Sequence, residues 1–173
     1  MPKLFWIDIE TTGLVPACED VLEIALVETD LSAPFEPISS RSWVIRCDLD
    51  IGAYDPVVQK MHTDNGLFVE CRGDKAVSWA SVNTELLAIV PKVEDRRARP
   101  ILAGSSVHFD RDFLLEHFPV VAARFSHVLY DVSAIKLFCK SLGIPPLPKG
   151  EAHSAMPDIL ESMAHSKECH SWL

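Results

Sequence analysis

The sequence predicts one α/β domain over residues 1–173, in which helices flank a mixed five-stranded sheet. Three apolar segments come first, and turn-forming or proline- and serine-rich connections separate them, which favours three antiparallel strands. Strand and helix patterns then alternate, an order typical of a sheet with helices packed on its faces. A length of 173 residues and an apolar fraction of 48% are consistent with a single buried core.

The first half of the chain contains the three early strands and two helical patterns. The strands are expected over residues 3–10, 20–29 and 41–47. A short helix is expected over 56–61. Apolar side chains then recur at helical spacing over 75–90, until the polar run 92–99 ends the pattern.

The second half alternates strands with helices. Strands are expected over 100–103 and 128–130, helices over 110–118 and 131–142, and a proline-rich loop over 143–150. A last helix is expected to begin near Ser154, its N-cap, and to end near 167–173. Pro157 supports that start, because proline fits the first turn of a helix, where backbone N–H groups lack partners.

Composition and charge exclude several classes of protein. The sequence has no run of about 18 apolar residues and no leader-like segment, so we expect a cytoplasmic protein that does not span a membrane. The five cysteines are widely spread without a C-x-x-C pair, which argues against a disulfide framework and a zinc site. A net charge of −9 disfavours long duplex nucleic acid, whereas short or single-stranded nucleic acid remains a candidate ligand.

Asp8 and Glu10 lie at the end of the first expected strand, directly before the turn signal at 11–14. Alternate side chains of a strand share a face, so the two carboxylates are expected about 7 Å apart at their Cβ atoms. Their repulsion favours a cation between them, and hard oxygen ligands are suited to Mg²⁺ or Mn²⁺. The alternative interpretation is a solvated strand end.

Two later segments add further titratable side chains. Asp110 follows a strand and begins a helix, so it is expected at the carboxyl end of the sheet, where ligand sites of α/β proteins collect. His153 and Asp158 are five residues apart, and side chains at that spacing diverge by about 140° on one helix. They can converge only if His153 lies in the loop before the helix. Asp110 as a helix-favourable charge and His153 as an exposed loop residue are the alternatives.

At these residues the sequence resembles the DEDDh 3′-to-5′ exonucleases, and among them the oligoribonucleases. Five ordered motifs carry the resemblance and cover nearly the whole chain. They are WIDIETTGL (6–14), HTDNGL (62–67), SVHFDRDFL (106–114), YDVS (130–133) and HSAMPD (153–158).

The resemblance implies a ribonuclease-H-like sheet and a homodimer that releases 5′-mononucleotides from the 3′ ends of short single-stranded RNA. It implies two Mg²⁺ or Mn²⁺ ions and a general base, His153. Two such ions can hold the attacking and leaving oxygens of a phosphoryl displacement. The implied metal ligands are Asp8, Glu10, Asp110 and Asp158. The implied substrate-binding residues are Thr11, Leu14, His62, Ser106 and Ser133.

Three departures from the oligoribonuclease pattern concern the substrate. A family tryptophan is Val57 here, a family arginine is Val128, and a tyrosine that reaches across the dimer is His127. Tyr54 and His127 are candidate replacements for the lost ring and phosphate contact. These departures keep open a general exonuclease acting on single-stranded DNA or RNA. A non-catalytic nucleotide-binding module is a further alternative.

Three other features concern the surroundings of the site. Glu23 is a charge within an apolar strand and is a candidate support behind the site. Trp6 shares a face with the two carboxylates and is expected to fill the core. The basic run Arg96, Arg97 and Arg99 precedes a strand whose far end leads to Asp110, so we interpret it as a solvated loop at the opposite end of the sheet.

Overall fold

A computed structural model describes residues 2–145 and 154–172, and within them five strands form one sheet in the order β3-β2-β1-β4-β5. β1 pairs with β2, and β2 with β3, in antiparallel fashion, whereas β1 with β4 and β4 with β5 are parallel. The predicted mixed sheet with three antiparallel strands is therefore confirmed. The strands are β1 Lys3–Thr11, β2 Val21–Asp30, β3 Ser39–Val44, β4 Ile101–Gly104 and β5 Leu129–Asp131.

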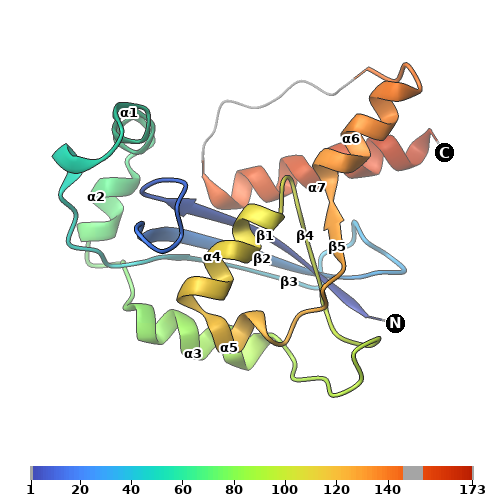
Figure 1. The fold of residues 1–173 in the computed structure, drawn as a ribbon, viewed down its shortest axis with the longest axis horizontal. Helices are drawn as coiled ribbons and strands as arrows, with labels where there is room; N and C mark the ends of the chain where they lie inside the picture. Colours follow the sequence, from blue (N-terminus) through green and yellow to red (C-terminus); the bar gives the residue numbers. More distant parts are fainter. Residues whose placement is uncertain (1, 146–153, 173) are drawn as a thin grey trace.

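Helices cover both faces of this sheet (Figure 1). α3, α4 and α5 lie on one face, α6 and α7 lie on the other, and α1 and α2 lie beside one end of β1 and β2. The helices are α1 Pro56–Asp64, α2 Leu67–Arg72, α3 Trp79–Ile89, α4 His108–His117, α5 Pro119–Ala122, α6 Val132–Ser141 and α7 Ala155–Ser171. A short 3₁₀ helix, η1, spans Ile51–Ala53.

The alternation of side chains along β1 builds two separate cores. Phe5 and Ile7 belong to the cluster under α3, α4 and α5, whereas Leu4 and Trp6 pack against α7. This division follows from the period of two residues in a strand. Trp6 is fully buried, as expected, and its Nε1 donates to the Thr29 hydroxyl at 3.1 Å. Asp8 and Glu10 continue the face that packs against α7.

Two short helices are absent from the sequence prediction. α2 follows Gly66, which adopts a left-handed φ of 80° and so separates α2 from α1. α5 follows α4 after Phe118, with Pro119 at its first position. Both helices are too short to show a helical period, but Asn65-Gly66 and Pro119 are recognisable boundary signals.

Two predicted helix starts are wrong. α3 begins at Trp79 rather than near residue 75, because Ser78 caps it by accepting a hydrogen bond from the Ser81 N–H. α4 begins at His108, two residues before Asp110, which therefore lies within the first turn. Part of the predicted 143–150 loop lies outside the described residues, because 146–153 are not described. No helix in the described ranges is long and apolar enough to cross a membrane.

Candidate active site

Three carboxylates converge where β1 meets the start of α7. Carboxylate oxygens of Asp8, Glu10 and Asp158 all lie within 4.8 Å of one another. Asp8 and Glu10 share one face of β1, and Asp158 projects from the first turn of α7. The structure therefore brings together three predicted site residues that come from opposite ends of the sequence. A set of carboxylate oxygens this close is suited to a hard divalent cation.

The fold opposes the ionisation of Asp8 and Glu10. Burial, followed by repulsion from Asp110 and Glu10, raises the pKa of Asp8 to about 9. Burial and repulsion from Asp158 and Glu23 raise the pKa of Glu10 to about 7. A cation bound among them would relieve both effects, because it attracts the ionised form. The donor set and its electrostatics thus fit a divalent metal.

Asp110 lies beside this cluster but is turned toward the backbone of β1. Its Oδ1 accepts a hydrogen bond from the Ile9 N–H at 2.9 Å, and its side chain is almost fully buried. Burial raises its pKa well above the usual value, although that hydrogen bond opposes the rise. Of the four predicted ligands, three group closely and Asp110 is held next to Asp8.

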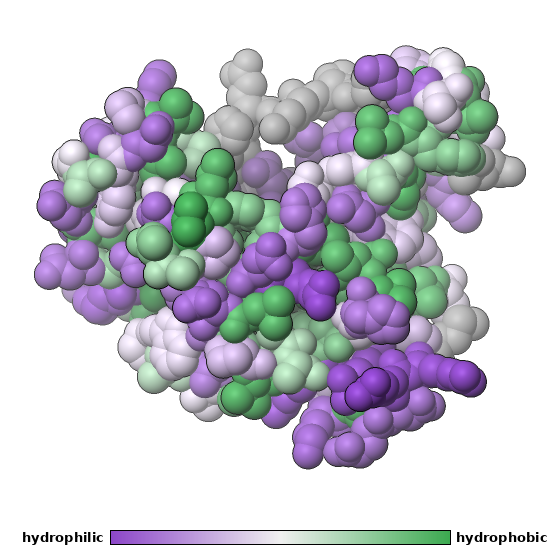
Figure 2. Space-filling model, viewed as in Figure 1, coloured by the Kyte–Doolittle hydropathy of each residue, from purple (hydrophilic) through white to green (hydrophobic). Residues whose placement is uncertain are grey.

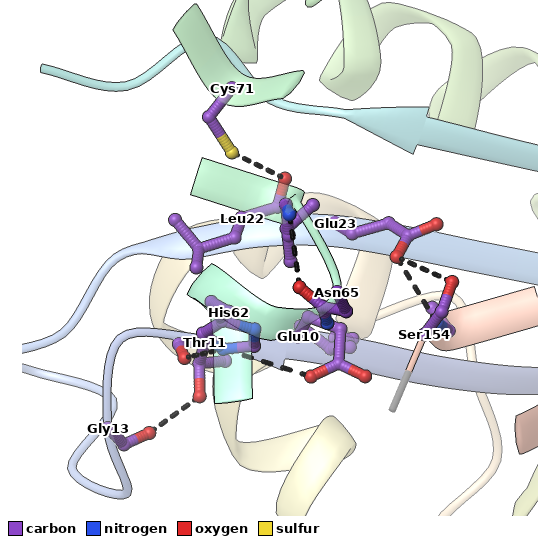
Figure 3. A network of polar contacts seen from close by, with 12 residues as sticks. Glu10, Thr11, Gly13, Leu22, Glu23, His62, Asn65, Cys71 and Ser154 are labelled. Atoms are coloured by element: carbon purple, nitrogen blue, oxygen red, sulfur yellow. Dashed lines mark hydrogen bonds and ion pairs between the residues drawn. The ribbon is translucent and has the colours of Figure 1, made fainter. Parts of the chain in front are cut away.

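Glu23 links β2 to the start of α7 (Figure 3). It pairs across the strands with Glu10. Its Oε2 accepts hydrogen bonds from the Ala155 N–H at 3.2 Å and the Ser154 hydroxyl at 3.4 Å. Ser154 is the N-cap residue as predicted, but its side chain does not bond the helix. Glu23 takes over that role, because a carboxylate is a stronger acceptor for the free N–H groups of a helix start.

His62 lies beneath the site rather than on its surface. The ring is fully buried and packs edge-on against Phe68. Its Nε2 is 3.0 Å from the carbonyl of Thr11 and 4.0 Å from Glu10 Oε2. Figure 3 marks both contacts with dashed lines. Thr11 is also buried, and its hydroxyl donates to the carbonyl of Gly13. These contacts fix the turn that follows Glu10.

Ser106 and Ser133 come together at the carboxyl ends of β4 and β5. Their hydroxyl oxygens are 3.0 Å apart. Asp131 holds the pair, because its Oδ1 accepts hydrogen bonds from the backbone N–H of Ser106 at 3.1 Å and of Ser133 at 2.8 Å. Ser106 adopts a left-handed φ of 53°, which turns the chain from β4 toward α4. Leu14 is 79% exposed, so its side chain is accessible to a ligand.

Asp131 is a site residue that sequence reasoning missed. The sequence signal was its position two residues before Ser133, where an aspartate commonly caps the start of a helix. The connection to Ser106 is long-range and could not be read from spacing. His153, the predicted general base, lies outside the described residues.

The positions that depart from the oligoribonuclease pattern lie on the surface. Val57 is 73% exposed on α1, and Val128 is exposed before β5. The ring of Tyr54 stacks on Phe68 with centroids 5.9 Å apart, so it is packed toward α2. His127 is exposed, and it lines a cavity with Arg96 and other basic residues at the start of β4 and β5.

Comparison with known sequences supports these observations. A protein-family profile described as an exonuclease (RNase_T) matches residues 5–165. The chain is 30% identical over 165 residues to an oligoribonuclease of Chromobacterium violaceum, a match that covers 93% of this chain and 90% of that protein. It is 34% identical to an oligoribonuclease of Rhodococcus jostii, with 95% and 84% covered.

Solved structures share the fold at lower identity. The zinc-bound form of the E. coli ExoI–ssDNA complex superposes with a TM-score of 0.77 at 18% identity and covers 99% of this chain. An exonuclease I from Methylocaldum szegediense gives a TM-score of 0.72 at 17% identity. This chain spans about two fifths of the length of these proteins, 41% and 39% respectively. The likeness confirms the predicted ribonuclease-H-like sheet.

Proposed function

Because the chain belongs to the exonuclease family and is a 3′-5′ exonuclease, we propose that it hydrolyses short oligoribonucleotides to 5′-mononucleotides. The observation that carries the proposal is the convergence of Asp8, Glu10 and Asp158 within 4.8 Å, with Asp110 alongside. Relatives named oligoribonucleases match most of this chain and most of their own length, which favours RNA as the substrate.

The four carboxylates are the proposed ligands of two Mg²⁺ or Mn²⁺ ions. Such ions, when bound, neutralise the phosphate charge and orient the attacking water and the leaving oxygen. The pKa values of Asp8 and Glu10 are raised by burial and by repulsion between acidic groups, and a bound cation would offset both effects. Asp110 contributes while its Oδ1 stays bonded to Ile9, which fixes the orientation of its carboxylate.

His153 is the proposed general base. A neutral imidazole accepts a proton near pH 7, which a carboxylate committed to a metal does poorly. His153 directly precedes Ser154 in the sequence. Glu23 anchors this start of α7, because it accepts hydrogen bonds from the Ser154 hydroxyl and from the Ala155 backbone N–H. In this proposal, His153 takes the proton of the attacking water.

Substrate binding is assigned to the other predicted residues. The exposed side chain of Leu14 contacts the terminal bases, and the hydroxyls of Ser106 and Ser133 bind a phosphate. Thr11 and His62 act from beneath, by fixing the turn between Glu10 and Leu14. We assign the protein to the cytoplasm as a homodimer, in accord with its oligoribonuclease resemblance. Light scattering tests the dimer.

A general exonuclease acting on single-stranded DNA or RNA is the second candidate. The observation that favours it is that the exposed side chains of Val57 and Val128 are themselves neither aromatic nor cationic. Base stacking contributes about 1–3 kcal/mol per base, so its loss would weaken discrimination by length.

The test is cleavage of 5′-labelled RNA of two, five and twenty nucleotides, with matched DNA, in Mn²⁺. We expect the dinucleotide to be the preferred substrate, with 5′-mononucleotide products. Equal turnover of every length and both sugars would instead identify the general exonuclease. Binding without any cleavage would contradict both and indicate a nucleotide-binding module.

A further inference from the structure

A cavity of about 340 Å³ lies beside α4, and three arginines line it. Arg96 and Arg99 belong to the loop before β4, and Arg111 lies in α4 directly after Asp110. His127, just before β5, lines the same cavity. Hydrophilic side chains gather over the 91–99 loop at the lower right of Figure 2. The proposed mechanism uses none of these four side chains.

Within the described part of the chain, the guanidinium groups of this arginine cavity form no ion pair with an acidic side chain. Among residues 2–145 and 154–172, no carboxylate oxygen lies within 4.0 Å of Arg96, Arg99 or Arg111. Backbone carbonyls position Arg99, since its Nε donates to Val93 at 3.2 Å and its Nη1 to Ala123 at 3.3 Å. In a chain of net charge −9, such a cluster favours a ligand with several anionic oxygens, of which phosphate is the best match.

One face of α4 connects this cavity to the Ser106–Ser133 pair. His108, Arg111 and Leu115 share that face through their spacing of three and four residues. Seven residues of helix separate the first from the last, which is about 10 Å. At the upper end, His108 Nδ1 lies 4.0 Å from Oδ2 of Asp131, the residue that holds the serine pair.

β5 gives a second estimate of the distance between the arginine cavity and the serine pair. It is an edge strand, and His127 precedes it while Asp131 ends it. Four residues of extended chain span about 13 Å. The arginine cavity therefore lies about 10–13 Å from the serine pair, along a route that borders α4 and the sheet edge.

We propose that the arginine cavity binds phosphates of single-stranded RNA on the 5′ side of the nucleotides held at the serine pair. This inference rests on the proposed function and specifies how its longer substrates are held. At about 3.4 Å per stacked nucleotide, the route corresponds to about three or four nucleotides. A dinucleotide cannot reach the cavity, whereas an RNA of eight or more nucleotides can.

The test compares two charge-matched double variants. Arg96→Gln/Arg111→Gln removes two cavity guanidinium groups. Arg97→Gln/Arg41→Gln removes two exposed arginines that do not line the cavity, one from the same basic run and one from β3. KM and kcat are measured in Mn²⁺ for RNA of two, five and twelve nucleotides over a range of salt concentrations, after equal melting temperatures show that both variants fold.

We expect the cavity variant to raise KM for the twelve-nucleotide RNA about tenfold, with kcat and dinucleotide KM unchanged. The slope of log KM against log salt should fall by about 1.4, the value for two phosphate contacts on a single strand. The control variant should show neither change. Inorganic phosphate should compete with the twelve-nucleotide RNA in the wild type and much less in the cavity variant.

Other outcomes overturn the inference. An equal change in KM for all lengths, or the same change in the control variant, would show that general charge rather than the cavity is responsible. Competition by phosphate without any effect of RNA length would identify a site for free phosphate instead. If the wild type cleaves none of the three lengths in Mn²⁺, the proposed function itself fails, which is a distinct result.

Discussion

Asp8 is surrounded by acidic side chains. Its carboxyl group therefore binds a proton more tightly in the folded protein than in the unfolded protein. Its pKa is about 9 in the fold against 3.8 for an unperturbed aspartate, and that of Glu10 is about 7 against 4.5. An acid with a raised folded pKa lowers stability as pH rises from the unfolded value through the folded one. The metal-free protein should therefore lose stability between about pH 4 and pH 9.

Asp8→Asn tests this electrostatic account. In EDTA, we expect the melting temperature of the wild type to fall between pH 5 and pH 8. That of the variant should fall less, because the amide does not ionise and only the other buried acids, such as Glu10, still lose stability with pH. Mn²⁺ should raise the melting temperature of the wild type at pH 8 and have little effect on the variant. Parallel pH profiles for the two proteins would contradict the assignment.

The proposed role of His153 as general base predicts a pH dependence of turnover. If it is the general base, log kcat should rise with slope one below a pKa near 6.5 and level off above it. His153→Ala should lower kcat about 10²–10⁴-fold and remove that rise. A variant that keeps the same rise would show that another group accepts the proton. The dinucleotide is the substrate, and Mn²⁺ is kept saturating at each pH.

At the scale of elements, the start of α7 is the part of the site that depends on long-range packing. Glu23 on β2 accepts a hydrogen bond from the Ala155 N–H and so anchors the helix that carries Asp158. The sequence showed Glu23 as a charge within an apolar strand and so as a candidate support behind the site. Its partner could not be predicted, because the two residues are 132 positions apart.

Two variants of Glu23 separate its hydrogen bond from its charge. Glu23→Ala removes the acceptor and should destabilise the protein by about 0.5–2 kcal/mol, the usual cost of losing a helix cap. Glu23→Gln keeps an acceptor oxygen and removes repulsion with Glu10, so in EDTA it should be at least as stable as the wild type. Urea unfolding measures both. Equal stability of the two variants would mean that the cap contributes nothing.

The sequence predicted the long, patterned elements more reliably than their ends. The five strands and the positions of α1, α3, α4, α6 and α7 are recognisable from hydrophobic period and turn signals. α2 and α5 were missed because six and four residues cannot display a helical period. The start of α4 was missed because Ser106 adopts a left-handed conformation, which cannot be predicted from its residue type.

At the scale of the whole molecule, topology explains why distant motifs meet. β1 is central in the sheet, with antiparallel β2 on one side and parallel β4 on the other. Its carboxyl end thus adjoins the start of α4, and α7 crosses the face that carries Asp8 and Glu10. The carboxylates were identified from spacing and family resemblance. The arginine cavity was not, because Arg111 and the 96–99 run meet only through the packing of α4 against the loop before β4.

The most direct test of the central claim is the Mn²⁺ dependence of dinucleotide cleavage in the wild type and in Asp8→Asn. We predict that EDTA abolishes cleavage, that Mn²⁺ restores it, and that the variant retains less than about 10⁻³ of wild-type kcat/KM, a loss of several kcal/mol of transition-state stabilisation. Wild-type cleavage that persists in EDTA, or a variant as active as the wild type, would contradict a metal-dependent exonuclease at these carboxylates.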